Sequence, residues 1–186
     1  MGGLPCQSQP LTKMRDTFMD LETYSPEPIN NGSHRYAEKA EVLLWAYADG
    51  DGDIKVWDVA NGYLHWQDEL TGLWEEQYIG KPFPPQSLIE ILHDPDAAVW
   101  FHNGGMFDFV VLRHAMPELL KLVDISRWRD TMVQAFAHAL PGALEKLGEV
   151  LNLHEDRRKI ADGKKLVRLF CMPQNEDFAK KWGTVR

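Results

Sequence analysis

A buried-type strand that runs directly into a glycine turn and a helix constrains the fold of this chain most. Residues 97–102 (AAVWFH) predict a strand with apolar residues on both faces. Residues 103–105 (NGG) break the strand, and residues 106–114 predict a helix with its apolar side turned inward. Strand, glycine turn and helix in this order are typical of a parallel sheet covered by helices. The sequence therefore predicts an α/β fold.

The segments around this unit complete the predicted sheet. Preceding strands are predicted over residues 15–22, 41–49 (EVLLWAYAD) and 54–59 (IKVWDV). The turn at residues 49–52 (DGDG) makes the last two antiparallel. Residues 34–39 are expected to be a connector. Residues 61–85 have no hydrophobic period, so we expect a loop insertion with Trp66 and Trp74 as anchors.

The C-terminal half adds strand and helix units. A strand is predicted over residues 123–129, and helices are predicted over residues 86–93, 132–139 and 143–151, with a helical turn at 166–170 and a charged loop at 156–165. Asp130 or Thr131 can cap the helix that follows them. Three antiparallel strands followed by parallel units predict an RNase H-like mixed sheet flanked by helices, with the first strand in the middle.

Length and charge limit the possible function. The 186 residues suit one domain, with residues 1–14 as a flexible leader, 15–173 as the domain and 174–186 as a polar tail. The net charge of -8 argues against a broad basic surface for nucleic acid, but it allows an acidic site that carries metal ions. Cys6 and Cys171 are the two cysteines, so we expect no disulfide framework. No membrane span or signal peptide is evident, and we expect a cytoplasmic protein.

Two carboxylates on the first predicted strand suggest a cation site. Side chains alternate along a strand, so Asp20 and Glu22 share one face while Met19 and Leu21 point into a core. Like charges placed side by side repel each other, and a cation relieves that repulsion. Asp108, in the first turn of the predicted helix, is expected to face the same cleft. Three converging carboxylates suit Mg²⁺ or Mn²⁺, and two such ions hydrolyse phosphodiester bonds.

Simpler interpretations stand beside this one. Asp20 and Glu22 can belong to a solvated strand, and Asp108 can complement its helix dipole. Asp130 is explained by capping a helix. His34 and His102 are expected to be packed or hydrogen-bonded histidines rather than ligands. The basic residues between positions 157 and 168 form either a solvated face or a phosphate contact.

These residues resemble a known family. Residues 18–23 (FMDLET) and 103–108 (NGGMFD) are similar to the first two motifs of the DEDD 3′–5′ exonucleases. Residues 130–132 (DTM), 141–147 (PGALEKL) and 163–173 are similar to the proofreading domain of phage-type family A DNA polymerases, and the resemblance spans residues 16–173. It implies a protein of a bacterial or phage-infected cell that acts on single-stranded DNA 3′ ends.

The resemblance also implies roles for individual residues. Asp20, Glu22 and Asp108 would be catalytic metal ligands, and a metal-bound hydroxide would replace a general base. The residues that would line the groove for the 3′-terminal nucleotides are Leu21, Thr23, Asn103 and Phe107.

The family has a third motif, in which a Tyr or His precedes an Asp by about one helical turn. We expect a truncated or split proofreading domain, because no such pattern occurs before Arg186. A polymerase domain or another polypeptide would supply the missing motif. The alternatives are a DNA-end-binding or partner-docking domain without catalysis, and an exoribonuclease of the same superfamily.

Overall fold

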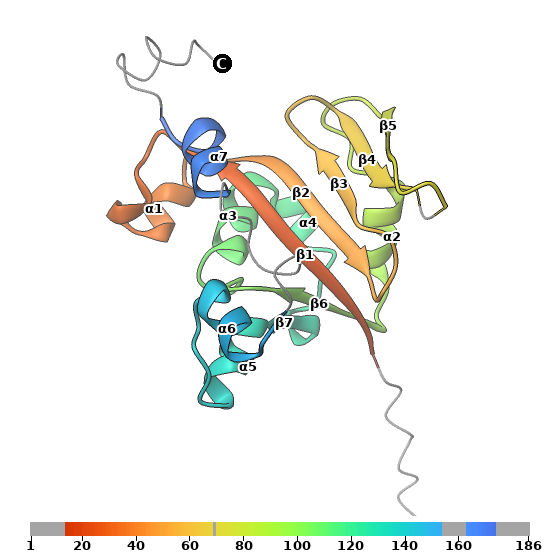
Figure 1. The fold of residues 1–186 in the computed structure, drawn as a ribbon. Helices are drawn as coiled ribbons and strands as arrows, with labels where there is room; N and C mark the ends of the chain where they lie inside the picture. The colour runs from red at the N-terminus through yellow and green to blue at the C-terminus, as the bar shows by residue number, and fades with distance from the viewer. Residues whose placement is uncertain (1–13, 69, 154–162, 174–186) are drawn as a thin grey trace, which may run out of the picture.

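The protein is organised around one mixed β-sheet with helices packed against it (Figure 1). The computed structural model describes residues 14–68, 70–153 and 163–173. The sheet has seven strands in the order β5-β4-β3-β2-β1-β6-β7. The strands are β1 (Arg15–Tyr24), β2 (Glu41–Asp49), β3 (Lys55–Asp58), β4 (Tyr63–Gln67), β5 (Trp74–Tyr78), β6 (Ala97–Phe101) and β7 (Trp128–Asp130). The predicted α/β class and the RNase H-like mixed sheet are confirmed.

β1 lies inside the sheet and sets the position of the other strands. It pairs antiparallel with β2 and parallel with β6, and β6 pairs parallel with β7. Met19 and Leu21 are buried on one face of β1, whereas Asp20 is exposed on the other. The alternation predicted from the sequence is therefore present.

Helices cover the apolar face of the sheet. The helices are α1 (Ser33–Ala37), α2 (Gln86–His93), α3 (Asp108–Ala115), α4 (Pro117–Leu120), α5 (Thr131–Ala137), α6 (Leu144–Val150) and α7 (Gly163–Phe170), with 3-10 turns η1 (Ile29–Asn31) and η2 (Ile125–Arg127). Figure 1 shows α2, α3 and α4 behind the sheet and α7 in front of it near the end of β1. The core between the sheet and the helices contains Trp45 and Trp57, whose rings stack at 6.4 Å between centroids, together with Leu88, Leu92 and Val111.

The predicted loop insertion at residues 61–85 is wrong over most of its length. Strands β4 and β5 form a hairpin that extends the sheet, and its turn is held by the Asp68 carboxylate, which accepts the N–H groups of Leu70 and Thr71. Every residue of β5 is exposed, so neither face gives the hydrophobic period that signals a strand. Trp74 is 59% exposed and does not anchor the segment.

Two shorter segments also differ from the prediction. The strand predicted over residues 123–129 begins only at Trp128, because Asp124 caps the 3-10 turn η2 before it. The expected connector at residues 34–39 contains helix α1, whose Tyr36 is buried. The leader, the polar tail and residues 156–162 of the charged loop lie outside the described residues. No helix in the described part of the chain is long and apolar enough to cross a membrane.

Candidate metal-binding and catalytic site

Strand β1 provides the first two carboxylates of the candidate site. Asp20 and Glu22 lie on the face of β1 opposite the core residues Met19 and Leu21. Their neighbours across the β1–β2 ladder are Ala46 and Leu44. Ala46, opposite Asp20, carries only a methyl group.

The turn after β6 is held by the carboxylate of Asp130, which is not one of the predicted ligands. Asn103 adopts a positive φ of 63°, a conformation that asparagine tolerates better than most residues. Asp130 accepts the backbone N–H groups of Asn103 and Gly105 at 3.0 and 3.1 Å, and also that of Met132 at 2.8 Å. Asp130 therefore caps α5, as predicted, and in addition ties the turn after β6 to the end of β7.

Gly104 is required by packing within this turn. A Cβ atom at Gly104 would lie 2.4 Å from Cβ of Phe101, whereas one at Gly105 would meet only Asp130 Oδ2, at 3.8 Å. Packing therefore explains the glycine at position 104, since the turn folds back closely against Phe101.

Asp108 is the carboxylate most affected by its neighbours. It begins α3 and is only 3% exposed. Burial raises its pKa, and the negative charges of Asp20, Asp130 and Glu22 raise it further, to about 8. The structure thus brings the three predicted ligands into electrostatic range of one another. A cation bound here would relieve this repulsion.

The donor chemistry of these residues fits a hard cation. Carboxylate oxygens are the ligands that Mg²⁺ and Mn²⁺ prefer. Among the described residues, no three His, Cys, Asp or Glu side chains are already close enough together to hold a metal ion. The residues that would hold such ions are Asp20, Glu22 and Asp108.

The predicted groove residues differ in how much of each side chain a substrate could reach. The side chains of Leu21 and Thr23 are buried, and the Thr23 hydroxyl lies 2.9 Å from the Tyr36 hydroxyl. These two residues can therefore offer a substrate only their backbone. Phe107 is partly buried and packs against the Tyr36 ring at 5.6 Å, while Asn103 is partly exposed beside the turn.

Cys171 contacts one of the carboxylates, whereas His102 is held by residues at the start of α5 and after its end. The Cys171 thiol, which follows α7, donates to Glu22 Oε2 at 3.5 Å. No sequence signal indicated this contact between residues that lie far apart in the chain. His102 is hydrogen-bonded, as predicted: Nε2 donates to the Gly142 carbonyl at 2.9 Å, and Nδ1 lies 2.9 Å from the Thr131 hydroxyl.

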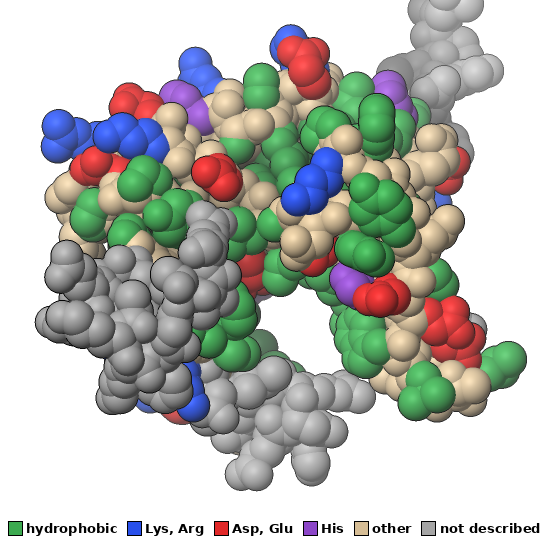
Figure 2. Space-filling model, turned by 90° about the horizontal axis from the view of Figure 1, so that it is seen from above, with side chains coloured by type: hydrophobic (Ala, Val, Ile, Leu, Met, Phe, Trp, Pro, Cys, Tyr) green, Lys and Arg blue, Asp and Glu red, His purple; other side chains and the backbone are tan. Residues whose placement is uncertain are grey.

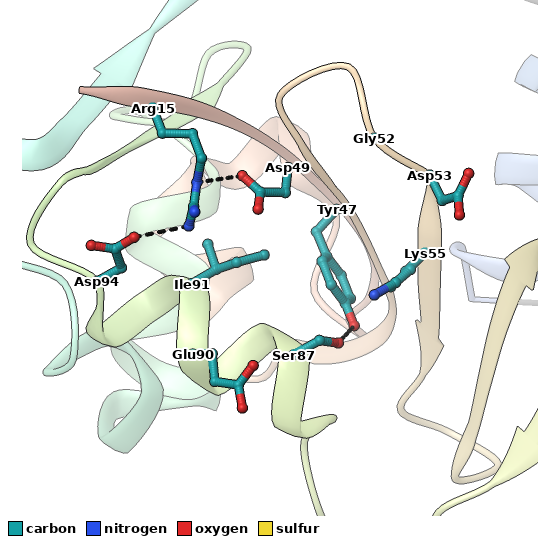
Figure 3. A pocket seen from close by; sticks show the side chains of 10 residues that line it. All are labelled: Arg15, Tyr47, Asp49, Gly52, Asp53, Lys55, Ser87, Glu90, Ile91 and Asp94. Atoms are coloured by element: carbon teal, nitrogen blue, oxygen red, sulfur yellow. Dashed lines mark hydrogen bonds and ion pairs between the residues drawn. The ribbon is translucent and has the colours of Figure 1, made fainter. Parts of the chain in front are cut away.

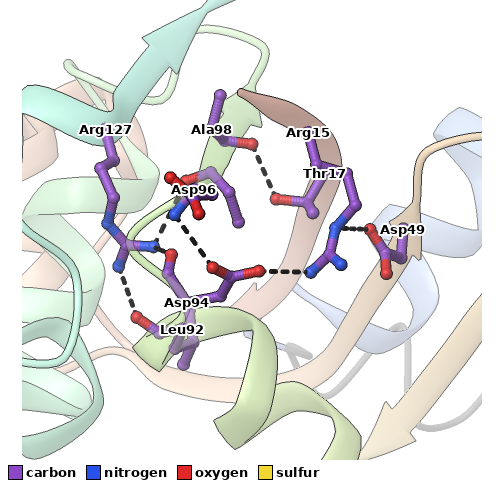
Figure 4. Close-up of polar contacts among 9 residues, drawn as sticks. Arg15, Thr17, Asp49, Leu92, Asp94, Asp96, Ala98 and Arg127 are labelled. Carbon is purple, nitrogen blue, oxygen red and sulfur yellow. Dashed lines mark hydrogen bonds and ion pairs between the residues drawn. The ribbon is translucent and has the colours of Figure 1, made fainter. Parts of the chain in front are cut away.

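A separate hollow of about 530 Å³ lies at the start of β1 on the core side of the sheet (Figure 3). Its main charged groups are paired, because Arg15 bridges Asp49 at 2.6 Å and Asp94 at 2.9 Å. Nearby, the buried Arg127 guanidinium donates to the carbonyls of Leu92 and Asp94 (Figure 4). We assign this cluster to structure, since these contacts hold the loop before β6 in place.

Comparison with known proteins relates the chain to a polymerase. No family model matches it. Over 163 residues it is 28% identical to a DNA polymerase of Bacillus phage SP02, a match that covers 86% of this chain and 21% of that protein. The chain thus spans about a fifth of the length of the curated relative it matches. The similarity points to a polymerase-related family at most.

Proposed function

We propose that the chain is a metal-dependent 3′–5′ exonuclease domain that hydrolyses phosphodiester bonds at single-stranded DNA 3′ ends in association with a DNA polymerase. The observation that carries the proposal is the buried Asp108 carboxyl, whose pKa is raised to about 8 by burial and by nearby carboxylates that include Asp20 and Glu22. The similarity to a phage DNA polymerase supports the same substrate.

Different residues of the chain would bind the metal ions, position the turn after β6 and contact the substrate. Asp20, Glu22 and Asp108 would hold two Mg²⁺ or Mn²⁺ ions, which supply an activated water and stabilise the leaving oxygen. Asp130 would keep the turn at Asn103 in position through the N–H groups that it accepts. The strand backbone beside Asp20 would contact the terminal nucleotide.

A nuclease assay tests this function. A 5′-labelled single-stranded DNA oligonucleotide is incubated with the protein and Mn²⁺, and the proposal predicts a ladder of products shortened from the 3′ end. Asp20→Asn should abolish the ladder. The matched control is Asp16→Asn on the same face of β1, because an amide oxygen can still accept the Trp100 indole N–H that Asp16 accepts at 2.8 Å.

A non-catalytic DNA-end-binding or partner-docking domain is the second candidate. The contact between the Cys171 thiol and a Glu22 oxygen favours it, because that oxygen would have to be released before it could bind a metal. Half-exposed apolar residues on the last helices, including Phe136, Leu144 and Leu166, also suit a partner. Oligonucleotide binding that is lost in Asp20→Ala, with no degradation by the unmodified chain, would establish this candidate. Faster degradation of RNA than of DNA would instead indicate an exoribonuclease.

A further inference from the structure

The outer hairpin of the sheet carries a cluster of aromatic rings. The Tyr63 ring stacks on His65, with 6.1 Å between centroids and 29° between planes, and meets Tyr78 edge-on at 5.2 Å. Tyr78 is 63% exposed and Trp74 is 59% exposed. Both belong to β5, the outermost strand, where exposed rings contribute little to a core. We call these four residues the aromatic platform.

The aromatic platform lies on the same face of the sheet as the candidate metal ligands. The strand registers form one row across the sheet, from Asp20 through Ala46 and Val56 to His65 and Glu76. A second row leads from Glu22 to Tyr63 and Tyr78. The sheet face between the carboxylates and the rings is lined by the partly exposed side chains of Leu44, Ala46, Ala48 and Val56, together with the Asp58 carboxylate next to Tyr63.

Charge on this face is unlike that of a surface that binds DNA through its phosphates. Within β1 to β5, no Lys or Arg shares the face of Asp20. His65 Nδ1 lies 3.5 Å from a Glu76 carboxylate oxygen, so a protonated His65 forms an ion pair with Glu76. Figure 2 views the molecule from above, where hydrophobic, acidic and basic side chains are interspersed. A strand of DNA can therefore gain affinity here through its bases rather than its phosphates. Bases stack on exposed aromatic rings without regard to sequence.

We propose that the aromatic platform binds the unpaired DNA strand by base stacking and so guides its 3′ end to the carboxylates of β1. The proposal rests on the function proposed above. Asp20 and His65 are three strands apart, which at ~4.8 Å per strand is about 14 Å. At the ~3.4 Å rise of stacked nucleotides, the platform would hold bases about four positions from the 3′ end.

Binding of a 5′-labelled single-stranded DNA oligonucleotide, with a nuclease-resistant 3′ linkage, tests the platform. Fluorescence anisotropy is measured in Mn²⁺ with the double variant Trp74→Ser and Tyr78→Ser. Both side chains are exposed, so the variant should fold, and circular dichroism checks that it does. We expect its affinity to fall at least about five-fold. The matched control is Gln77→Ser on the opposite face of β5, and Tyr78→Phe should keep the affinity because it keeps the ring.

Two further measurements distinguish stacking from other modes of binding. Abasic sites placed about four nucleotides from the 3′ end should weaken binding to the unmodified protein as much as the double variant does. The affinity should change little between low and high salt, whereas a surface that neutralises phosphates loses affinity steeply.

The outcomes separate this proposal from the proposed function. If the double variant binds and degrades DNA like the unmodified protein, the platform is refuted while the exonuclease stands. If the unmodified protein binds DNA through the platform but releases no nucleotide, the exonuclease fails and the platform stands. The unmodified protein can also sediment as a dimer while the double variant sediments as a monomer and binds DNA normally. In that case the face binds a second copy of the chain, and the proposal is overturned.

Discussion

Replacing Asp108 by Asn should stabilise the metal-free protein while abolishing its activity. The unfolded chain releases the Asp108 proton near pH 3.8, whereas the folded protein keeps it to about pH 8. Folding therefore takes up a proton between these values, so the stability contributed by this group falls as the pH rises. At pH 7 this shift in pKa lowers the free energy of unfolding by on the order of 4 kcal/mol. Asparagine has nearly the same shape as the protonated carboxyl group and does not titrate. The substitution therefore removes this loss of stability at neutral pH.

Urea denaturation of both proteins in EDTA measures the effect. The stabilisation in Asp108→Asn should be near zero at about pH 4 and should grow up to about pH 8. At neutral pH it should raise the melting temperature by about 10 °C. Asp16→Asn controls for the loss of one carboxylate from the same region. Equal stabilisation at acid and neutral pH would refute the reasoning, as would a destabilised variant at neutral pH. Added Mn²⁺ should stabilise only proteins that retain Asp108.

Three further substitutions test the frame around the site. Asp130→Ala removes the acceptor shared by the turn after β6 and by α5, and should cost about 2 kcal/mol of unfolding free energy in urea. Gly104→Ala places a methyl group against Phe101 and should cost about 1–3 kcal/mol, whereas Gly105→Ala should cost less; equal losses would contradict the packing argument. Arg127→Met leaves several backbone carbonyls without their donor and should cost at least about 3 kcal/mol by the same measurement, and a loss below about 1 kcal/mol would show that the guanidinium is not needed.

Hydrophobic periodicity correctly predicted those strands and helices in which at least one face is buried. Strand β2 and helix α2 begin and end where the sequence placed them, because Trp45 and Tyr47 in β2 and Leu88 and Leu92 in α2 are buried. Strand β5 was missed because all its residues are exposed. The start of β7 was misplaced because the backbone before it forms the 3-10 turn that directs Arg127 inward, and this interaction has no periodic signal.

The candidate site was predictable only in part. Alternation along β1 placed Asp20 and Glu22 together, and the same alternation buries Leu21 and Thr23, which limits their role to the backbone. Sequence position placed Asp108 in the first turn of its helix. Contacts made by distant segments were not predictable. The main example is the Cys171 thiol at Glu22, which depends on how α7 returns to the sheet.

Release of nucleotides from single-stranded DNA in Mn²⁺ tests the central claim most directly. A 5′-labelled oligonucleotide should be shortened stepwise from its 3′ end by the unmodified protein and by Asp16→Asn, and should remain intact with Asp20→Asn, Glu22→Gln or Asp108→Asn. Stepwise shortening that persists in these three variants, or an intact oligonucleotide with the unmodified protein, would contradict the assignment of these carboxylates as the catalytic metal ligands.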